Sequence, residues 1–179
     1  MTTPADRHRD FAATFQHVVD ETTDWDAPSP VKEWSARDIV DHLLDWLPPV
    51  LSAWADVDLP DAQGDSPSQR WAHRTAAVQA LLDDPDLSGR PVQDGPFDGQ
   101  PLALVIDRIY TADIYMHTWD LARANHTPVT LDPAYAQEAL DGMRPIENIL
   151  RESGQYGAPV STDSADPVDQ LMAFIGRHP

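Results

Sequence analysis

Four pairs of a short polar residue followed by proline constrain the fold of this chain most strongly. Apolar residues at helical spacing follow each pair, and the pairs are Thr3-Pro4, Ser66-Pro67, Asp132-Pro133 and Asp166-Pro167. The polar side chain can accept from the first free N–H groups of a helix, and proline suits the first helical position because it has no N–H. The pattern predicts helices that begin near residues 4, 67, 133 and 167.

A further helix is expected between the first two of these. Ser35-Ala-Arg-Asp38 approximates a capping box, with Asp in place of the usual Glu or Gln, and predicts a helix start. Pro48 and Pro49 should bend this second helix about one turn after His42.

A long fourth helix is expected to begin at Pro101 and to continue to about Asn125. The preceding residues 86–100 are rich in Gly and Pro and predict an ordered loop with a short extended piece at 91–93. The next helix carries apolar residues at helical spacing as far as Leu150.

The whole pattern predicts an all-α fold. We expect a bundle of four long helices with a long connection and a short C-terminal helix, which Gly176 should end. A chain of 179 residues suits one domain over residues 1–179.

The amino-acid composition indicates whether the chain folds and in which environment we expect it. Hydrophobic residues make up 41% of the chain and six are tryptophan, which favours a folded core. No segment approaches the roughly 18 uninterrupted apolar residues of a membrane span, and the first residues lack the apolar run of a signal peptide. We expect a cytoplasmic protein that does not contact a membrane.

Charge and cysteine content exclude further classes. The formal net charge is −18 and Lys32 is the only lysine, so the protein should repel phosphate backbones, and nucleic acid is not an expected partner. The chain has no cysteine, so it has no disulfide and no thiolate ligand. Any thiol chemistry must use a thiol from outside.

The candidate functional residues are His42, Asp113 and His117. Asp113 and His117 are four residues apart, so they share one face of the long helix, and they fall inside its apolar stripe. Such a pair also arises by chance or as a buried core pair. His42 lies on the inward side of another helix, and two facing helices could bring all three side chains together. Two imidazoles and one carboxylate would leave coordination positions free, as in catalytic metal sites.

The other histidines are weaker candidates. His8, His17 and His73 are interpreted as residues of solvated helix faces, His126 as a helix-ending residue, and His178 as terminal.

Asp120, one turn beyond His117, has two open interpretations. It could orient His117 through the ring N–H, or it could form a salt bridge with Arg123 or Arg37. Trp119 is interpreted as a packing residue, and Tyr110 and Tyr115 are weaker candidates for lining a pocket.

With these residues in place, the chain resembles the DinB-like metal-binding bundle superfamily, in the branch named after mycothiol-dependent maleylpyruvate isomerase. The resemblance spans nearly the whole chain. It is carried by the segments Trp34-Ser-Ala-Arg-Asp-Ile-Val-Asp-His42-Leu, Asp113-Ile-Tyr-Met-His117-Thr-Trp119-Asp120-Leu-Ala-Arg123 and Asp166-Pro-Val-Asp-Gln-Leu171-Met-Ala-Phe-Ile-Gly176-Arg-His-Pro179.

The resemblance implies a four-helix bundle that holds a divalent metal through a His, an acid and a His. These roles fall on His42, Asp113 and His117, although the family's acid is commonly Glu and Asp113 is one methylene shorter. Zinc is the first choice, with nickel, iron or manganese as alternatives. The resemblance also implies a low-molecular-weight thiol such as mycothiol as cofactor or substrate. The isomerase itself has a further C-terminal domain for which this chain is too short, so isomerisation of maleylpyruvate is not implied.

Two functions of different classes remain open. The first is a metal-dependent enzyme, a thiol-using transferase or isomerase that acts on a small electrophile, with a hydrolase as a variant. The alternative is a non-catalytic bundle protein that binds metal or a small ligand. A bundle with an empty site is a third outcome. The expected partners are a small-molecule substrate or thiol and, through exposed apolar helix faces, a second copy of the chain in a homodimer.

Overall fold

The computed structural model describes residues 2–179, and every named element of secondary structure in this range is a helix or a helical turn. This confirms the all-α prediction. Two isolated bridges, Pro28 with Ser35 and Pro91 with Pro101, pair short pieces of extended backbone. Within the described residues, no helix is both long enough and apolar enough to cross a bilayer.

The described residues group into two compact units. The first extends to Ser29 and continues over Glu33–Thr127, and the second comprises Pro30–Lys32 and Pro128–Pro179. A single domain over residues 1–179 stays a prediction.

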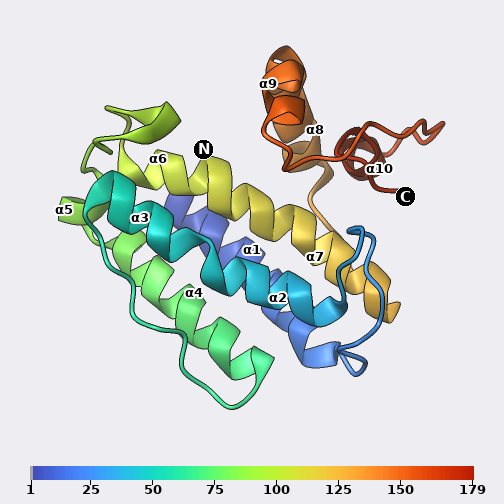
Figure 1. Ribbon diagram of the computed structural model, residues 1–179, viewed down its shortest axis with the longest axis horizontal. Helices are drawn as coiled ribbons and strands as arrows, with labels where there is room; N and C mark the ends of the chain where they lie inside the picture. The colour runs from blue at the N-terminus through green and yellow to red at the C-terminus, as the bar shows by residue number, and fades with distance from the viewer. Residues whose placement is uncertain (1) are drawn as a thin grey trace. The chain divides into compact units, whose positions relative to one another are not determined.

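The first unit is built around the helices labelled α1, α2, α4 and α7 in Figure 1. Its elements are α1 (Pro4–Glu21), α2 (Ala36–Asp45), α3 (Leu47–Ala55), α4 (Pro67–Asp83), α5 (Pro85–Ser88), the 3₁₀ turn η1 (Gly95–Phe97), α6 (Leu102–Ile106), the π-turn η2 (Asp107–Thr111) and α7 (Ala112–Asn125). Helices α1 and α2 each pack against both α4 and α7. Fully buried side chains between them form the core, and Phe15 and Trp71 meet there edge to face, with ring centroids 4.6 Å apart.

The predicted helix starts of this unit are confirmed. Thr3 accepts a hydrogen bond from the Asp6 N–H, and Ser66 accepts one from the Gln69 N–H. The capping box before α2 is complete, because Ser35 and Asp38 each accept from the other's backbone N–H.

The predicted bend in the second helix is also present, as a break at Trp46 between α2 and α3. Pro48 has no N–H to donate to the carbonyl of Leu44, four residues earlier. The guanidinium of the buried Arg74 donates to that carbonyl instead, at 3.1 Å. The break therefore leaves no unsatisfied carbonyl at Leu44, and α2 can end one turn beyond His42.

The predicted long fourth helix is present from Leu102 to Asn125, but it is not α-helical throughout. Five residues, Asp107–Thr111, form a π-turn between α6 and α7. Tyr110 and Thr111 are buried, whereas Ile109, which helical spacing placed in the apolar stripe, is half-buried. Apolar periodicity cannot resolve a single wide turn, because the pattern resumes as an ordinary helix on either side.

The Gly- and Pro-rich segment before α6 is an ordered loop, as expected, but it also contains α5 and η1. Its extended piece is confirmed by the bridge between Pro91 and Pro101 and by the Val92 N–H, which donates to the Gln100 carbonyl at 2.9 Å.

The second unit contains α8 (Pro133–Met143), the 3₁₀ turn η3 (Arg144–Ile146), α9 (Glu147–Glu152) and α10 (Pro167–Phe174). Helix α8 packs against α10, and Asp132 and Asp166 cap these two helices as predicted.

Two helix ends in this unit follow from proline and glycine. The expected helix to Leu150 is interrupted at η3, because Pro145 cannot continue the α-helical hydrogen bonds. Gly176 ends the last helix as predicted, at φ +91°, and a Cβ there would lie 2.9 Å from the Gly157 Cα.

Candidate metal centre

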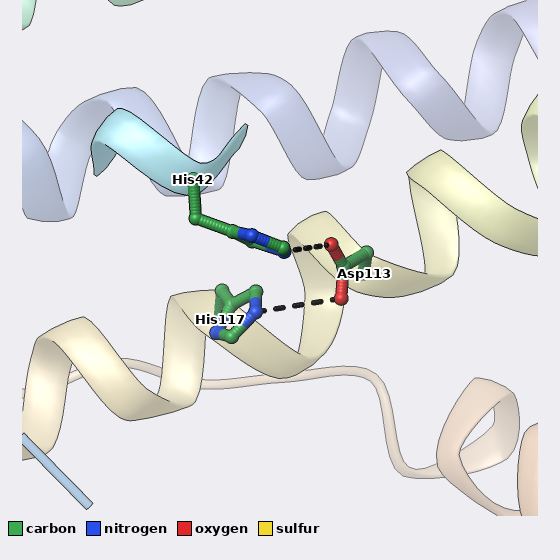
Figure 2. A group of neighbouring side chains, drawn as sticks. All are labelled: His42, Asp113 and His117. Atoms are coloured by element: carbon green, nitrogen blue, oxygen red, sulfur yellow. Dashed lines mark hydrogen bonds and ion pairs between the residues drawn. The ribbon is translucent and has the colours of Figure 1, made fainter. Parts of the chain in front are cut away.

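The three predicted ligands converge on one point in the first unit. One donor atom from each of His42, Asp113 and His117 lies within 4.8 Å of the other two. Nε2 of His42 is 3.0 Å from Asp113 Oδ2, and Nε2 of His117 is 3.4 Å from Asp113 Oδ1. Figure 2 shows the carboxylate beside the two rings, with one oxygen facing each ring, and with His42 on one helix and the other two residues on another. A separation beyond about 8 Å would have excluded a shared cation, since ligand bonds span about 2 Å.

Local structure explains the placement of each side chain. Asp113 and His117 occupy successive turns of α7, directly after the π-turn, and π-turns are frequent at functional sites. His42 lies in the last turn of α2. The buried hydroxyl of Tyr110 donates to the Leu43 carbonyl at 2.9 Å, which ties the π-turn to the turn of α2 that carries His42.

Two neighbouring side chains contact the same oxygen of the Asp113 carboxylate. The indole Nε1–H of Trp46 donates to Oδ2 at 3.0 Å, and His42 contacts the same oxygen. Burial raises the pKa of Asp113, but the charge of His117, the hydrogen bond and charge of His42 and the Trp46 hydrogen bond outweigh it, so the pKa lies below its ordinary value. Asp113 is therefore ionised at neutral pH, as a metal ligand must be.

The two interpretations of Asp120 can now be compared. Its Oδ2 lies 3.0 Å from Nδ1 of His117, and its side chain is 0% exposed. The two arginines considered as salt-bridge partners lie over indole rings, Arg123 over Trp119 at 4.8 Å and Arg37 over Trp25 at 5.9 Å. The contact with His117 corresponds to the first interpretation.

Three aromatic residues of this helical segment pack in the core rather than line an opening. Trp119 is buried, as expected for a packing residue. Tyr110 and Tyr115 are also almost completely buried, so they belong to the core.

Solvent reaches the cluster from the His42 side. The side chain of His42 is 30% exposed, whereas that of His117 is 6% exposed. An open depression lies here, and its lining residues are Glu33, Trp34, Asp38, Asp41, His42, Asp45 and Trp46.

Two indoles beside the cluster were missed as site residues. The Trp34 ring lies 4.9 Å from the His42 ring and 5.7 Å from the His117 ring, between centroids. Trp46 could have been found, because it lies four residues after His42 on the same helical face. Trp34 precedes the capping box, and helical spacing says nothing about residues outside the helix.

The structure corrects one histidine assignment. His8 was interpreted as solvated, but it is completely buried on α1. Its Nδ1 lies 2.8 Å from Gln79 Oε1, and its ring stacks on Tyr110 with centroids 6.3 Å apart. Burial lowers the pKa of His8, so the ring is neutral at pH 7. Of the others, His17, His126 and His178 are exposed, His73 is half-buried, and His126 ends α7 as predicted.

Comparison with known proteins places the chain near two uncharacterized relatives. Both are proteins of Mycobacterium tuberculosis, one from strain CDC 1551 / Oshkosh and one from strain ATCC 25618 / H37Rv. Each is 29% identical over 160 residues, which cover 84% of this chain and 83% of the relative. No family model matches the chain, and no solved structure matches it.

Proposed function

We propose that this chain is a divalent-metal-dependent enzyme of the mycothiol-dependent maleylpyruvate isomerase-like branch of DinB-like bundles. In this proposal the protein either transfers a thiol to a small electrophile or uses a thiol to isomerise that electrophile. His42, Asp113 and His117 hold the metal, with zinc as the first choice and nickel, iron or manganese as alternatives. The proposal also assigns the four helical segments of the first unit to the DinB-like bundle architecture, and it retains the expectation of a cytoplasmic protein.

The observation that carries the proposal is the convergence of two imidazoles and an ionised carboxylate within 4.8 Å, with the side chain of one imidazole, His42, 30% exposed to solvent. Two nitrogens and one oxygen suit zinc and other borderline divalent metals better than magnesium or calcium, which prefer oxygen ligands. Three protein ligands leave room for a further guest, which is typical of catalytic metal sites.

The residues of the chain have separable tasks. Asp113 offers a negative oxygen to the cation while Trp46 holds its Oδ2. His42 and His117 direct Nε2 atoms toward the carboxylate from two different helices. Trp34 packs its ring against both imidazole rings. When bound, the cation supplies a positive charge that lowers the pKa of a thiol or water at its free position. A thiol from outside would be needed, since the chain has no cysteine.

Metal analysis tests the first half of the proposal. Protein purified without added metal, and then dialysed against zinc, should hold about one equivalent. Less than about one-tenth of an equivalent, not restored by adding zinc, would mean that the site is empty. The His42→Ala variant serves as the comparison and should retain far less zinc than wild type.

Thiol turnover tests the second half. Zinc-loaded protein should consume a low-molecular-weight thiol in the presence of at least one electrophile from a panel, and His42→Ala should lose this activity while its far-UV circular dichroism stays the same. If zinc binds but no thiol is consumed, the chain is a non-catalytic binding protein for metal or a small ligand. Sedimentation of the same sample tests the proposed homodimer.

A further inference from the structure

We infer that Asp120 is a positioning residue that keeps a hydrogen on Nδ1 of His117 and thereby leaves Nε2 of that ring for the cation. The consequence for metal binding rests on the proposed function. The state of the ring itself does not, because it can be measured without metal.

The contact between Asp120 and His117 joins Asp120 Oδ2 to Nδ1 of the ring at 3.0 Å. A carboxylate can only accept, so with Asp120 ionised the Nδ1–H of His117 donates to Oδ2. A ring that binds a cation must be neutral, so when Nδ1 carries the hydrogen the lone pair for the cation lies on Nε2. That nitrogen is the one 3.4 Å from Asp113 Oδ1.

Burial makes this arrangement restrictive. The Asp120 side chain is 0% exposed and that of His117 is 6% exposed, so bulk water offers neither group a full set of alternative partners. A buried carboxylate is tolerated when charge-assisted hydrogen bonds satisfy it. Because both residues lie on α7, three positions apart, the helix holds them in register.

His42 provides the contrast within the same cluster. Its Nε2 lies 3.0 Å from Asp113 Oδ2, and its side chain is 30% exposed, compared with 6% for His117. His117 is therefore the less exposed ring of the pair, and a second carboxylate, Asp120, holds it through its other nitrogen.

Nitrogen NMR of the metal-free wild-type protein tests the inference directly. Spectra of ¹⁵N-labelled protein at about pH 8, with His117 assigned by its loss in His117→Ala, should show hydrogen on Nδ1 of His117. A bare, pyridine-type Nδ1 would overturn the inference. This outcome is independent of the proposed function, which fails separately if wild-type protein binds no zinc.

Three variants extend the test to metal affinity. Asp120→Leu removes the acceptor, and Nδ1 of the neutral His117 ring should then lose its hydrogen. The dissociation constant for zinc should rise about 10- to 100-fold, the range found for partners of metal-bound histidines. Asp120→Asn keeps an acceptor oxygen without the charge and should show a smaller rise. Asp10→Asn removes the same charge from an exposed position of α1 and is the control, with affinity within about twofold of wild type.

Circular dichroism must first show that Asp120→Leu is folded. If it is not, the comparison of Asp120→Asn with Asp10→Asn replaces it. A folded Asp120→Leu, or otherwise Asp120→Asn, that binds zinc within about twofold of wild type would overturn the positioning role.

Discussion

Two buried histidines of the first unit, His8 and His117, have similar contacts at Nδ1 and different surroundings at Nε2. Each ring has an acceptor on Nδ1, Gln79 Oε1 at 2.8 Å for His8 and Asp120 Oδ2 at 3.0 Å for His117. The difference lies at Nε2. For His117 this atom faces Asp113 in the candidate metal centre, whereas for His8 it is buried with no hydrogen-bond partner among residues 2–179.

The partner groups explain this difference. The Gln79 amide nitrogen donates to the Ala5 carbonyl and to Asp83, so its oxygen is left to accept from His8. A neutral amide and an apolar, stacked surrounding suit an uncharged core imidazole. His117 instead lies between two carboxylates, Asp113 and Asp120, which suit an imidazole beside a cation. Burial alone therefore does not distinguish a core histidine from a candidate ligand, but the groups that face both nitrogens do.

The largest expected effect is the loss of metal affinity in His117→Ala. Removal of one of three protein ligands should raise the dissociation constant for zinc by more than about 100-fold, as measured by competition with a chromogenic chelator. His17→Ala, at an exposed position of α1, is the control and should bind zinc as wild type does. Unchanged zinc affinity in His117→Ala would show that His117 is not a metal ligand, and the contrast with His8 would then fail.

His8→Ala should show the opposite behaviour. The variant loses a buried hydrogen bond, leaves the Gln79 oxygen without its donor and opens a cavity beside Tyr110. Its free energy of unfolding should fall by about 2–4 kcal/mol in urea denaturation. Its zinc affinity should stay within about twofold of wild type, and a large loss of zinc binding would show that the two histidines are not functionally distinct.

Acid should weaken the fold through His8. Burial lowers its pKa in the folded state, so below the ordinary value of about 6.5 the unfolded chain binds more protons than the folded one. The contribution of His8 is present above that pH and is lost as pH falls from it toward the lower folded pKa. Between about pH 7.5 and pH 5.5, wild type should lose up to about 1.4 kcal/mol more stability than His8→Gln, which cannot titrate. Equal losses in urea titrations would contradict a buried, neutral His8.

The smallest effect concerns the carboxylate that His117 faces. Trp46→Phe keeps an aromatic ring but removes the N–H that donates to Asp113 Oδ2. Zinc affinity should fall about threefold, because the carboxylate loses part of its orientation while remaining ionised. Trp54→Phe removes an indole N–H on α3 and should have no such effect on zinc titrations. An equal fall in both variants would assign the effect to packing.

Much of the helical framework could be predicted from local chemistry. The caps at Thr3, Ser35, Ser66, Asp132 and Asp166 and the stop at Gly176 were predicted and are present. Such features depend on hydrogen bonds within a few residues, so a short stretch of sequence contains the necessary information. The spacing of Asp113 and His117 is of the same kind, since α7 alone places them together.

Other features depended on contacts between segments far apart in the chain. Tertiary packing decided that His8 is buried against Gln79, since the helical pattern of α1 could not reveal how far its neighbour extends over it. The π-turn that precedes Asp113 is accompanied by an ion pair between Arg7 and Asp107, which are 100 positions apart. Trp34 reached the candidate site only because the turn before α2 folds its indole against both imidazoles.

The sequence by itself determined where most helices begin and end and which side chains share a helical face. Only the tertiary structure decided that His42 meets Asp113, which acceptor occupies the second nitrogen of each buried histidine, and from which side solvent enters. The physical reason is range: caps and helical spacing act over three or four residues, whereas burial and the pairing of titratable groups depend on which helices become neighbours in the folded chain.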